Sequence, residues 1–316
     1  IAAEYAIIDS KTTIIESAQA SGLPLLAEGE RNPLITSTYG TGELIKDAIA
    51  KGCRNIVIGL GGSATNDGGL GMLMALGYRF YDSNGNPLLQ QGGQVLEQIA
   101  HIDTLERMPE LVHCTFTIAC DVDNPFIGDN GATNVYALQK GATQKSLEVL
   151  EKNMRHWCTL LFQHTGIDLS TIKGSGAAGG LAGAFIALLN AKTISGIDYV
   201  LNSIDFDHQI MDADLVITGE GRIDRQTLMG KAPQGILRRT HNYAIPTIAL
   251  VGSVAEASLP RTGFDGIFPI QAGPISLKEA MTRSIANENL TRTIEQLLLF
   301  HKGTCHLCTT SRNNHT

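Results

Sequence analysis

The sequence predicts a two-domain α/β protein, in which a Rossmann-like parallel sheet domain is interrupted by an inserted mixed α/β domain. Three observations predict this class. Short apolar strand patterns alternate with helix patterns at both ends of the chain, and the region between them is less regular. Glycine accounts for 34 of the 316 residues, against a usual share of ~7%. Glycines in loops let the backbone approach a ligand closely, so the excess favours an enzyme that handles an anionic ligand.

The first elements are two short strands, a helix, a third strand and a second helix. Leu44, Ile45, Ala48 and Ile49 form one apolar helix stripe, and Gly52 ends that helix. The expected ranges are strands 6–8, 12–15 and 55–60, a helix over 42–51 and a helix ending at residue 77.

The middle of the chain predicts a hairpin, a strand and two helices, and regular alternation then returns. A capping box from Ser276 to Glu279 begins the last helix. The expected ranges are a hairpin at 78–81 with a turn at 84–87, strands 114–120, 215–218, 247–251 and 266–270, and helices 146–162, 181–189, 233–240 and about 276–300.

These elements predict a division into discontinuous domains. The Rossmann-like domain is expected to comprise residues 29–77 and 196–300, and the second α/β domain residues 1–28 and 78–195. Residues 301–316 are polar and lack periodicity, so they are expected to form a loose tail.

Composition excludes several classes of protein. Hydrophobic residues make up 43% of the chain, which excludes a disordered protein. The 24 basic and 31 acidic residues give a net charge of −7, which argues against binding to nucleic acid or to an anionic membrane. The six cysteines are scattered rather than arranged as a disulfide framework, so a cytoplasmic location is expected. The chain begins with Ile1 rather than Met, which leaves a targeting segment an open question.

The first glycine cluster follows the strand at 55–60 and continues to residue 69. In one interpretation it is a phosphate-and-metal loop, with Ser63 and Asn66 as donors and Asp67 directed toward Mg²⁺ or a substrate hydroxyl. Residues 59–64 also satisfy the dinucleotide pattern G-x-G-x-x-A, with Asp82 as the acidic partner. A tight structural turn is the third interpretation.

The second cluster, residues 174–180, matches G-x-G-x-x-G but follows a weak strand pattern. Either its glycines bind an anion, or they allow close helix packing. The third cluster, residues 219–224, directly follows the strand at 215–218 and carries Glu220, Arg222 and Asp224. Ligands of parallel sheets lie beyond the carboxyl ends of strands, so this is a candidate site, although an ion cluster that holds a loop is an alternative.

Two carboxylates and one cation complete the candidates. Asp121 and Asp123 follow the strand at 114–120 and are two residues apart, so both would point the same way if the strand continued. They could bind Mg²⁺ or orient a hydroxyl, or they could cap a turn before Pro125. Lys140, like Lys231 farther along the chain, is a cation expected to face a cleft, although a single lysine on a loop is more often simply solvated.

Taken together, these blocks resemble the bacterial glycerate kinase family, which is unrelated to protein kinases. The matching blocks lie in the family's order, and the resemblance extends from about residue 8 to residue 300. It implies two α/β domains and phosphorylation of D-glycerate by ATP and Mg²⁺ in the cleft between them, with 2-phosphoglycerate as the usual product. The blocks are residues 58–69, 119–125, 139–142, 174–180, 217–224 and 230–231.

Under this interpretation, backbone N–H groups of the first two glycine clusters hold the ATP phosphates, and the charged groups serve the metal, the acceptor hydroxyl and the transferred phosphate. D-glycerate is the expected partner, with no nucleic acid or membrane, and self-association stays open. The candidates are catalytic Asp67, Asp121, Lys140 and Arg222; nucleotide-binding Gly61, Gly62, Ser63, Asn66, Gly174, Gly176, Gly179 and Glu220; and metal-binding Asp121 and Asp123.

The chain departs from the family pattern at both ends. The family's N-terminal strand and helix units have no counterpart before Ile1, so the chain is expected to lack that segment, and residues 301–316 do not resemble the family's ending. Two other functions stay open: an NAD(P)-dependent oxidoreductase acting on a small hydroxy acid, and a non-catalytic remnant that binds a ligand.

Overall fold

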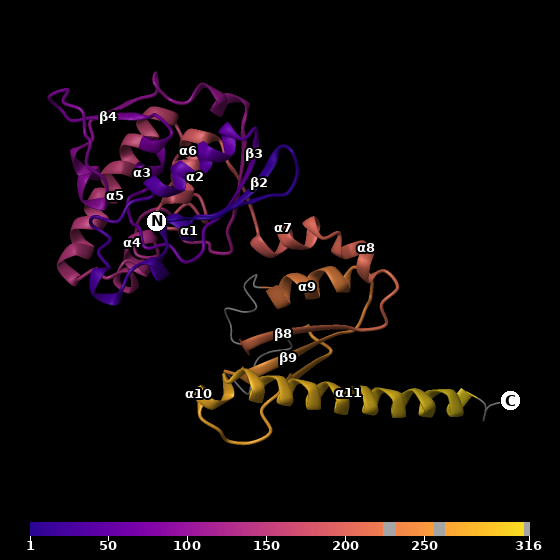
Figure 1. Cartoon of the computed structure of the whole chain (residues 1–316). Coiled ribbons are helices and arrows are strands. Elements are labelled where there is room, and N and C mark those ends of the chain that lie inside the picture. The colour runs from indigo at the N-terminus through magenta and orange to yellow at the C-terminus, as the bar shows by residue number, and fades with distance from the viewer. Residues whose placement is uncertain (224–231, 256–262, 313–316) are drawn as a thin grey trace. The chain divides into compact units, whose positions relative to one another are not determined.

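The computed structural model describes residues 1–223, 232–255 and 263–312. The chain divides into two compact units, unit 1 (Ile1–Gly196) and unit 2 (Ile197–Thr316) (Figure 1). Both units combine parallel strands with helices, so the predicted α/β class is confirmed.

Unit 1 contains a five-stranded sheet in the order β1-β2-β3-β6-β7. The strands β2, β3, β6 and β7 are parallel, and only β1 is antiparallel. Glu16, Gly59, Ala119 and Ile194 are paired in register, so the carboxyl ends of the four parallel strands lie side by side. The bounds are β1 (Ala6–Ile7), β2 (Thr12–Glu16), β3 (Asn55–Gly59), β6 (Thr115–Ala119) and β7 (Lys192–Ile194).

Helices pack against this sheet and against one another to form the main core (Figure 1). Helix α2 packs on β2 and α6 on β6, and α3 contacts both α2 and α6. Trp157 of α5 is fully buried, and its indole N–H donates to the Gly68 carbonyl at 3.0 Å. The bounds are α1 (Ala18–Ser21), α2 (Tyr39–Ala50), α3 (Leu70–Ala75), α4 (Ala132–Tyr136), α5 (Gln144–Thr165) and α6 (Leu181–Leu189), with short 3-10 helices at Leu23–Leu25, Glu28–Glu30, Gly93–Gln98, Pro109–His113 and Leu138–Lys140.

The predicted hairpin has a different partner. Strand β4 (Arg79–Tyr81) pairs antiparallel with β5 (His101–Asp103). The chain that returns after the turn at 84–87 forms only an isolated bridge, between Tyr81 and Pro87. The turn pattern indicated the reversal correctly, but it did not indicate which segment completes the ladder.

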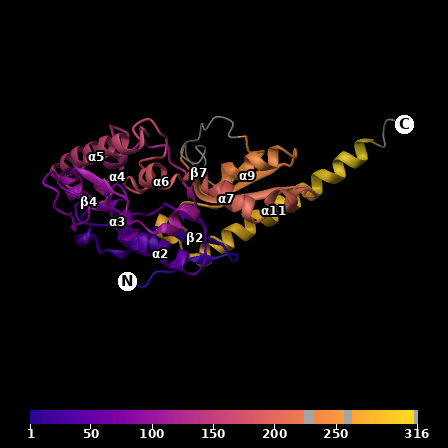
Figure 2. The same ribbon diagram turned by 90° about the horizontal axis from the view of Figure 1, so that it is seen from above.

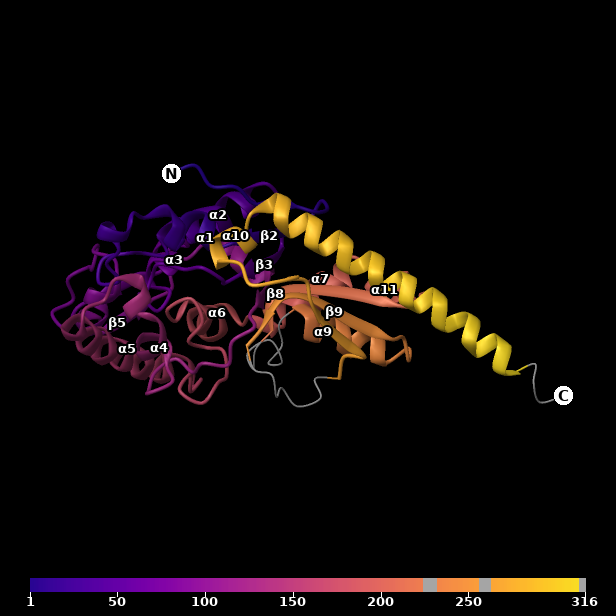
Figure 3. The same ribbon diagram turned by 90° about the horizontal axis from the view of Figure 1, so that it is seen from below.

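Unit 2 contains a parallel three-stranded sheet in the order β10-β9-β8. Helix α9 lies on one face of β8 and β9, and α11 runs along the other face (Figure 1). Figure 2 shows α7 and α9 in front of the strands, and Figure 3 shows α11 in front of them from the opposite side. The bounds are α7 (Gly196–Ser203), α8 (Phe206–Ile210), β8 (Val216–Ile223), α9 (Ala232–His241), β9 (Thr247–Val254), β10 (Gly266–Pro269), α10 (Leu277–Ala280) and α11 (Arg283–Arg312).

The structure groups the segments differently from the predicted domains. Residues 29–77 were expected to join residues 196–300, but they contain β3, which lies between β2 and β6 at the centre of the unit 1 sheet. The apolar pattern of β3 indicates a buried parallel strand, yet such a pattern does not identify the strand's neighbours. The units are therefore consecutive along the chain rather than interrupted.

The predicted C-terminal tail also differs. The backbone of α11 is helical through Arg312, so most of the segment 301–316 continues a helix instead of forming a loose tail. The capping box at Ser276 and Glu279 is present: the Glu279 N–H donates to Ser276 Oγ, and the Glu279 carboxylate accepts from the Ser276 N–H. It begins the short α10, and α11 follows as a separate helix.

One buried carboxylate joins the helices of unit 1. Asp67 is fully buried. Its Oδ2 accepts from the Thr38 N–H and Oγ1 at 2.8 Å each and from the Gly71 N–H at 3.2 Å, and its Oδ1 accepts from the Gly69 N–H at 3.1 Å. Thr38 Oγ1 in turn accepts from the Met72 N–H at 2.9 Å. Asp67 therefore binds the N-terminal ends of α2 and α3, where a negative charge is favourable.

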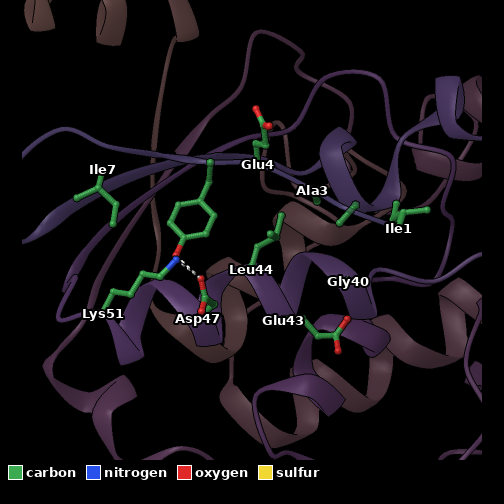
Figure 4. Close-up of a pocket in the computed structure, with 11 residues that line it drawn as sticks. Ile1, Ala3, Glu4, Ile7, Gly40, Glu43, Leu44, Asp47 and Lys51 are labelled. Atoms are coloured by element: carbon green, nitrogen blue, oxygen red, sulfur yellow. Dashed lines mark hydrogen bonds and ion pairs between the residues drawn. The ribbon is translucent and has the colours of Figure 1, made fainter.

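The N-terminal segment lies over α2 (Figure 4). The Tyr5 hydroxyl donates to Asp47 Oδ2, and the Lys51 ammonium contacts both Asp47, at 2.7 Å, and the Tyr5 ring. A hollow of about 550 Å³ lies between this segment and α2. It is built from the N-terminal segment, α1 and α2, so it lies away from the paired carboxyl ends of the parallel strands.

We predict that Asp67→Asn destabilises unit 1 by about 3 kcal/mol, because four donors converge on the carboxylate and an amide would turn an N–H toward one of them. The single tryptophan, Trp157, lies in unit 1 beside Gly68, so its fluorescence during urea unfolding measures this loss. The exposed Asp129→Asn is the matched control. A loss below about 0.5 kcal/mol would show that the network does not hold the helices.

Candidate active site

A cavity of about 410 Å³ lies in unit 1 beyond the carboxyl ends of β3 and β6. Ligands of parallel sheets occupy this position. Leu23, Leu60 and Val122 supply apolar walls, while Asp121 and Lys140 supply charge. Its size and its mixture of apolar walls with a few polar groups are typical of small-molecule sites.

Three consecutive residues of the loop after β3, Gly61, Gly62 and Ser63, line this cavity. Gly61 and Gly62 are exposed, and Ser63 follows them along the cavity wall. No described residue accepts a hydrogen bond from the N–H of Gly61, Gly62 or Ser63. The loop is held from behind, because the Gly62 carbonyl accepts from the Leu23 N–H at 2.8 Å. Gly62 has φ +73°, which favours glycine, and a Cβ on Gly61 would meet open space. These donors can bind an anion.

Lys140 is the buried cation of the cavity. Lys140 is the last residue of the short 3-10 helix Leu138–Lys140 and is 3% exposed. The ammonium donates to Ser63 Oγ at 2.9 Å and to the Thr65 carbonyl at 2.7 Å. Burial lowers the pKa of Lys140 to about 7, and the nearby Asp67 charge opposes that shift. The predicted position of this lysine at a cleft agrees with the structure.

The two candidate metal carboxylates point to different partners. Asp121 lines the cavity, and its Oδ1 accepts from Ser195 Oγ at 3.0 Å and from the Gly196 N–H at 2.8 Å. Asp123 is exposed, lies 3.6 Å from the Lys173 ammonium and lines a smaller neighbouring cavity. Strand β6 ends at Ala119, so the alternation that would have placed both carboxylates on one side does not continue.

The second glycine cluster packs into the protein. A Cβ on Gly179 would lie 2.0 Å from the Thr65 carbonyl oxygen, and one on Gly176 would lie 2.2 Å from that of Pro125. Gly174 has φ +79°, and a Cβ there would lie 3.0 Å from the Val122 carbonyl oxygen. The geometry therefore supports the close-packing interpretation of these three glycines. Only the tip of the loop, at Ala177 and Ala178, lines the cavity.

Two candidates of the first cluster are buried away from the cavity wall. Asn66 is fully buried, and its amide donates to Thr133 Oγ1 at 3.0 Å. Asp67 has the helix-end contacts described above, and burial raises its pKa while those hydrogen bonds act in the opposite direction. These contacts do not fit the expected nucleotide contact of Asn66 or the expected direct catalytic contact of Asp67.

Glu220 and Arg222 lie in unit 2, within strand β8. They were expected on a loop, but residues 219–223 continue the strand and pair with residues 250–254 of β9. Asp224 and Lys231, which also belong to the matching blocks, lie outside the described residues.

Several residues that line the cavity were not predicted from the sequence. Tyr136 lines the cavity four residues before Lys140, and its hydroxyl donates to Asn124 Oδ1 at 2.6 Å. Gln139 and Cys120 also line it. Gln139 stands in the block that contains Lys140, which was the available signal. No sequence pattern indicated Tyr136.

The donor set fits a nucleotide and a magnesium ion. The N–H groups of the 61–63 loop suit phosphate oxygens, and the cavity wall around Leu60 and Val122 suits an apolar ring. Asp121 Oδ2 has no hydrogen-bond partner among the described residues, and Mg²⁺ usually takes one or two carboxylates plus substrate phosphates. No cluster of three or more metal-ligating side chains occurs in the described residues. None of the described helices combines the length and apolarity of a membrane span.

Comparison with known proteins agrees with this geometry. The family model "Glycerate kinase family" matches residues 1–302. A glycerate kinase of Halalkalibacterium halodurans is 42% identical over 96% of this chain and 81% of its own length, and the Escherichia coli glycerate 2-kinase is 41% identical over 88% and 74%. The crystal structure of a Salmonella typhimurium LT2 protein that carries the name glycerate kinase 2 superposes with a TM-score of 0.79 at 39% identity, covering 95% of this chain and 79% of that one. The predicted resemblance is confirmed: this chain belongs to the glycerate kinase family.

Proposed function

We propose that this enzyme transfers a phosphoryl group from ATP to D-glycerate with Mg²⁺, giving 2-phosphoglycerate as the favoured product. One observation carries the proposal. A chain that matches the glycerate kinase family also has, at the carboxyl ends of two parallel strands, a cavity lined by both the glycine loop at 61–63 and the buried Lys140. The name of the E. coli relative, glycerate 2-kinase, supports the choice of product.

The backbone of the 61–63 loop is the phosphate-binding element of the proposal. Phosphoryl transfer depends mainly on positioning and on stabilisation of charge. The N–H groups of Gly61, Gly62 and Ser63 offer fixed donors that need no reorganisation on binding, and Lys140 adds positive charge from the same wall. The two glycines leave room for a phosphate because no Cβ covers their amides.

We propose Asp121 as the carboxylate that contacts the acceptor hydroxyl or the metal. Ser195 and Gly196 hold its Oδ1, which fixes the carboxylate plane and leaves Oδ2 for the acceptor hydroxyl of D-glycerate or for Mg²⁺. The metal, when bound, neutralises charge on the phosphates. We propose Asp123 as a weaker metal ligand. It is weaker because the Lys173 ammonium lies beside it.

The remaining candidate residues are proposed to contact the ligands or to shape the cavity. We propose that Arg222 binds a phosphate or carboxylate and that Glu220 contacts the nucleotide, since both belong to a block shared with the family. Asn66, Asp67 and the glycines of the 174–180 loop shape the cavity through packing. Cys53, Cys114, Cys120 and Cys158 are free thiols, which fits the proposed cytoplasmic location.

The direct test is glycerate-dependent release of ADP, with the product identified by NMR. ATP with Mg²⁺ is expected to raise the melting temperature, and NAD(P)H is not. Stabilisation by ATP without turnover would favour a ligand-binding remnant. Stabilisation by NAD(P)H would contradict the proposed enzyme class. Release of 3-phosphoglycerate would contradict the proposed product.

We predict that Asp121→Asn lowers kcat at least ~100-fold, the scale of losing a positioned catalytic group. The side chain is exposed and the change nearly isosteric, so the melting temperature is expected to stay within about 2 °C of the parent value. The control is Asp129→Asn, another exposed aspartate of unit 1, which is expected to retain full activity. Near-native kcat in Asp121→Asn would show that this carboxylate only holds the Ser195 turn.

A further inference from the structure

In its charged form, the buried side chain of Lys140 has one donor more than the protein uses. An ammonium carries three N–H donors. Ser63 Oγ and the Thr65 carbonyl accept two of them, and no other described residue accepts the third. Lys140 also lines the cavity, so the remaining donor is available to a bound ligand.

Among the residues that the structure describes, no acidic side chain makes direct contact with this ammonium. Asp67 interacts with it only through the electric field, because its oxygens are occupied by Thr38, Gly69 and Gly71. Asp121 lines the same cavity but is held by Ser195 and Gly196. Both accepting groups, a hydroxyl and a carbonyl, are neutral. Burial without a paired anion disfavours the charged form of a lysine, and an anionic ligand would supply the missing charge.

The other titratable groups of the cavity do not compete for this role. Burial raises the pKa of the Cys120 thiol and that of the Tyr136 phenol, so both are neutral near pH 8 and neither accepts a proton there. Asp67 carries the nearest negative charge and favours the ammonium form of Lys140.

We infer that the anionic ligand of this cavity binds together with one proton, which Lys140 takes up from solvent, and that Ser63 positions the resulting ammonium. The nitrogen lone pair accepts the proton, no other bond changes, and the charged lysine then donates to a carboxylate or phosphate oxygen. This inference rests on the proposed function, since D-glycerate and the nucleotide are the two candidate sources of that oxygen.

Calorimetric titration of the full chain tests this coupling. D-glycerate alone and ADP alone are titrated at pH 8 in HEPES and in Tris, whose ionisation enthalpies differ, and the difference in heat counts the protons taken up. We expect close to one proton for the probe that contacts Lys140, because a lysine with a pKa of about 7 is mostly neutral at pH 8. The dissociation constant of that probe is expected to rise up to about tenfold per pH unit between pH 7 and 9.

Variants identify the residue that takes up the proton. Lys140→Met is expected to bind the probe with no uptake, or not to bind it, whereas the exposed Lys145→Met keeps both affinity and uptake. Ser63→Ala keeps the lysine but removes one acceptor of the ammonium. We expect it to weaken binding roughly tenfold at pH 8 and less at pH 6, where protonation is easier. A purely structural role of Ser63 would weaken binding equally at both values.

The stability of the unliganded chain provides a second measurement. The pKa of Lys140 is lower in the folded chain than in the unfolded one, so between pH 7 and 10 the unfolded chain binds more protons. The contribution of Lys140 to stability therefore rises with pH across this range. Urea unfolding monitored by Trp157 is expected to show this rise in the parent and in Lys145→Met, and a smaller rise in Lys140→Met.

Uptake below about 0.2 proton for both probes would overturn the inference, as would undiminished uptake in Lys140→Met. The assay of glycerate-dependent ADP release separates this failure from failure of the proposed function. Turnover without proton uptake would leave the proposed function intact and remove only the role of Lys140, whereas absence of turnover in the parent chain would reject the function itself.

Discussion

The buried carboxylate of Asp67 is the constraint on which the rest of unit 1 depends. Burying an ion is costly unless donors compensate it, and Thr38, Gly69 and Gly71 supply those donors from the ends of α2 and α3. Those donors exist only when both helices begin where they do. The carboxylate also provides the negative field that favours the charged form of Lys140 in a wall of otherwise neutral acceptors. The charge of Asp67 therefore both holds the two helix ends and favours the charged form of Lys140.

Close approach of backbones explains why glycine is so common around this charge. A Cβ on Gly42 would lie 2.6 Å from the Met72 carbonyl oxygen, so α2 and α3 could not pack at their present distance with a side chain there. A Cβ on Gly69, which has φ +80°, would lie 2.4 Å from the Ala184 side chain of α6, and a Cβ on Gly68 would lie 2.4 Å from the Trp157 ring. The glycine excess seen in the sequence therefore serves packing between helices at least as much as contact with a ligand.

The periodicity of apolar residues predicted the helices and strands well, because the pattern that shows which face is buried lies within each segment. The strand at Asn55–Gly59 and the helix at Leu181–Leu189 have nearly the predicted bounds. Pairing is not a local property, so the sequence did not reveal that β3 lies between β2 and β6, or that β8 continues to Ile223 along β9. The same limit applies to the site. Lys140 was found from its block, but the burial of Asp67 depends on Thr38, a distant residue in the sequence.

Two glycine clusters with similar sequence patterns have opposite surroundings, and this difference locates the candidate site. The 174–180 loop matches the dinucleotide pattern G-x-G-x-x-G, yet a Cβ on Gly176 or Gly179 would lie 2.2 or 2.0 Å from a backbone carbonyl oxygen. Gly61 belongs to a looser pattern and has nothing within 4 Å of its Cβ position. An anion needs amides that no protein group occupies, so the property that distinguishes a binding loop is free space beside the backbone. That property follows from how the strands and helices around Lys140 pack, and a one-dimensional motif does not contain it.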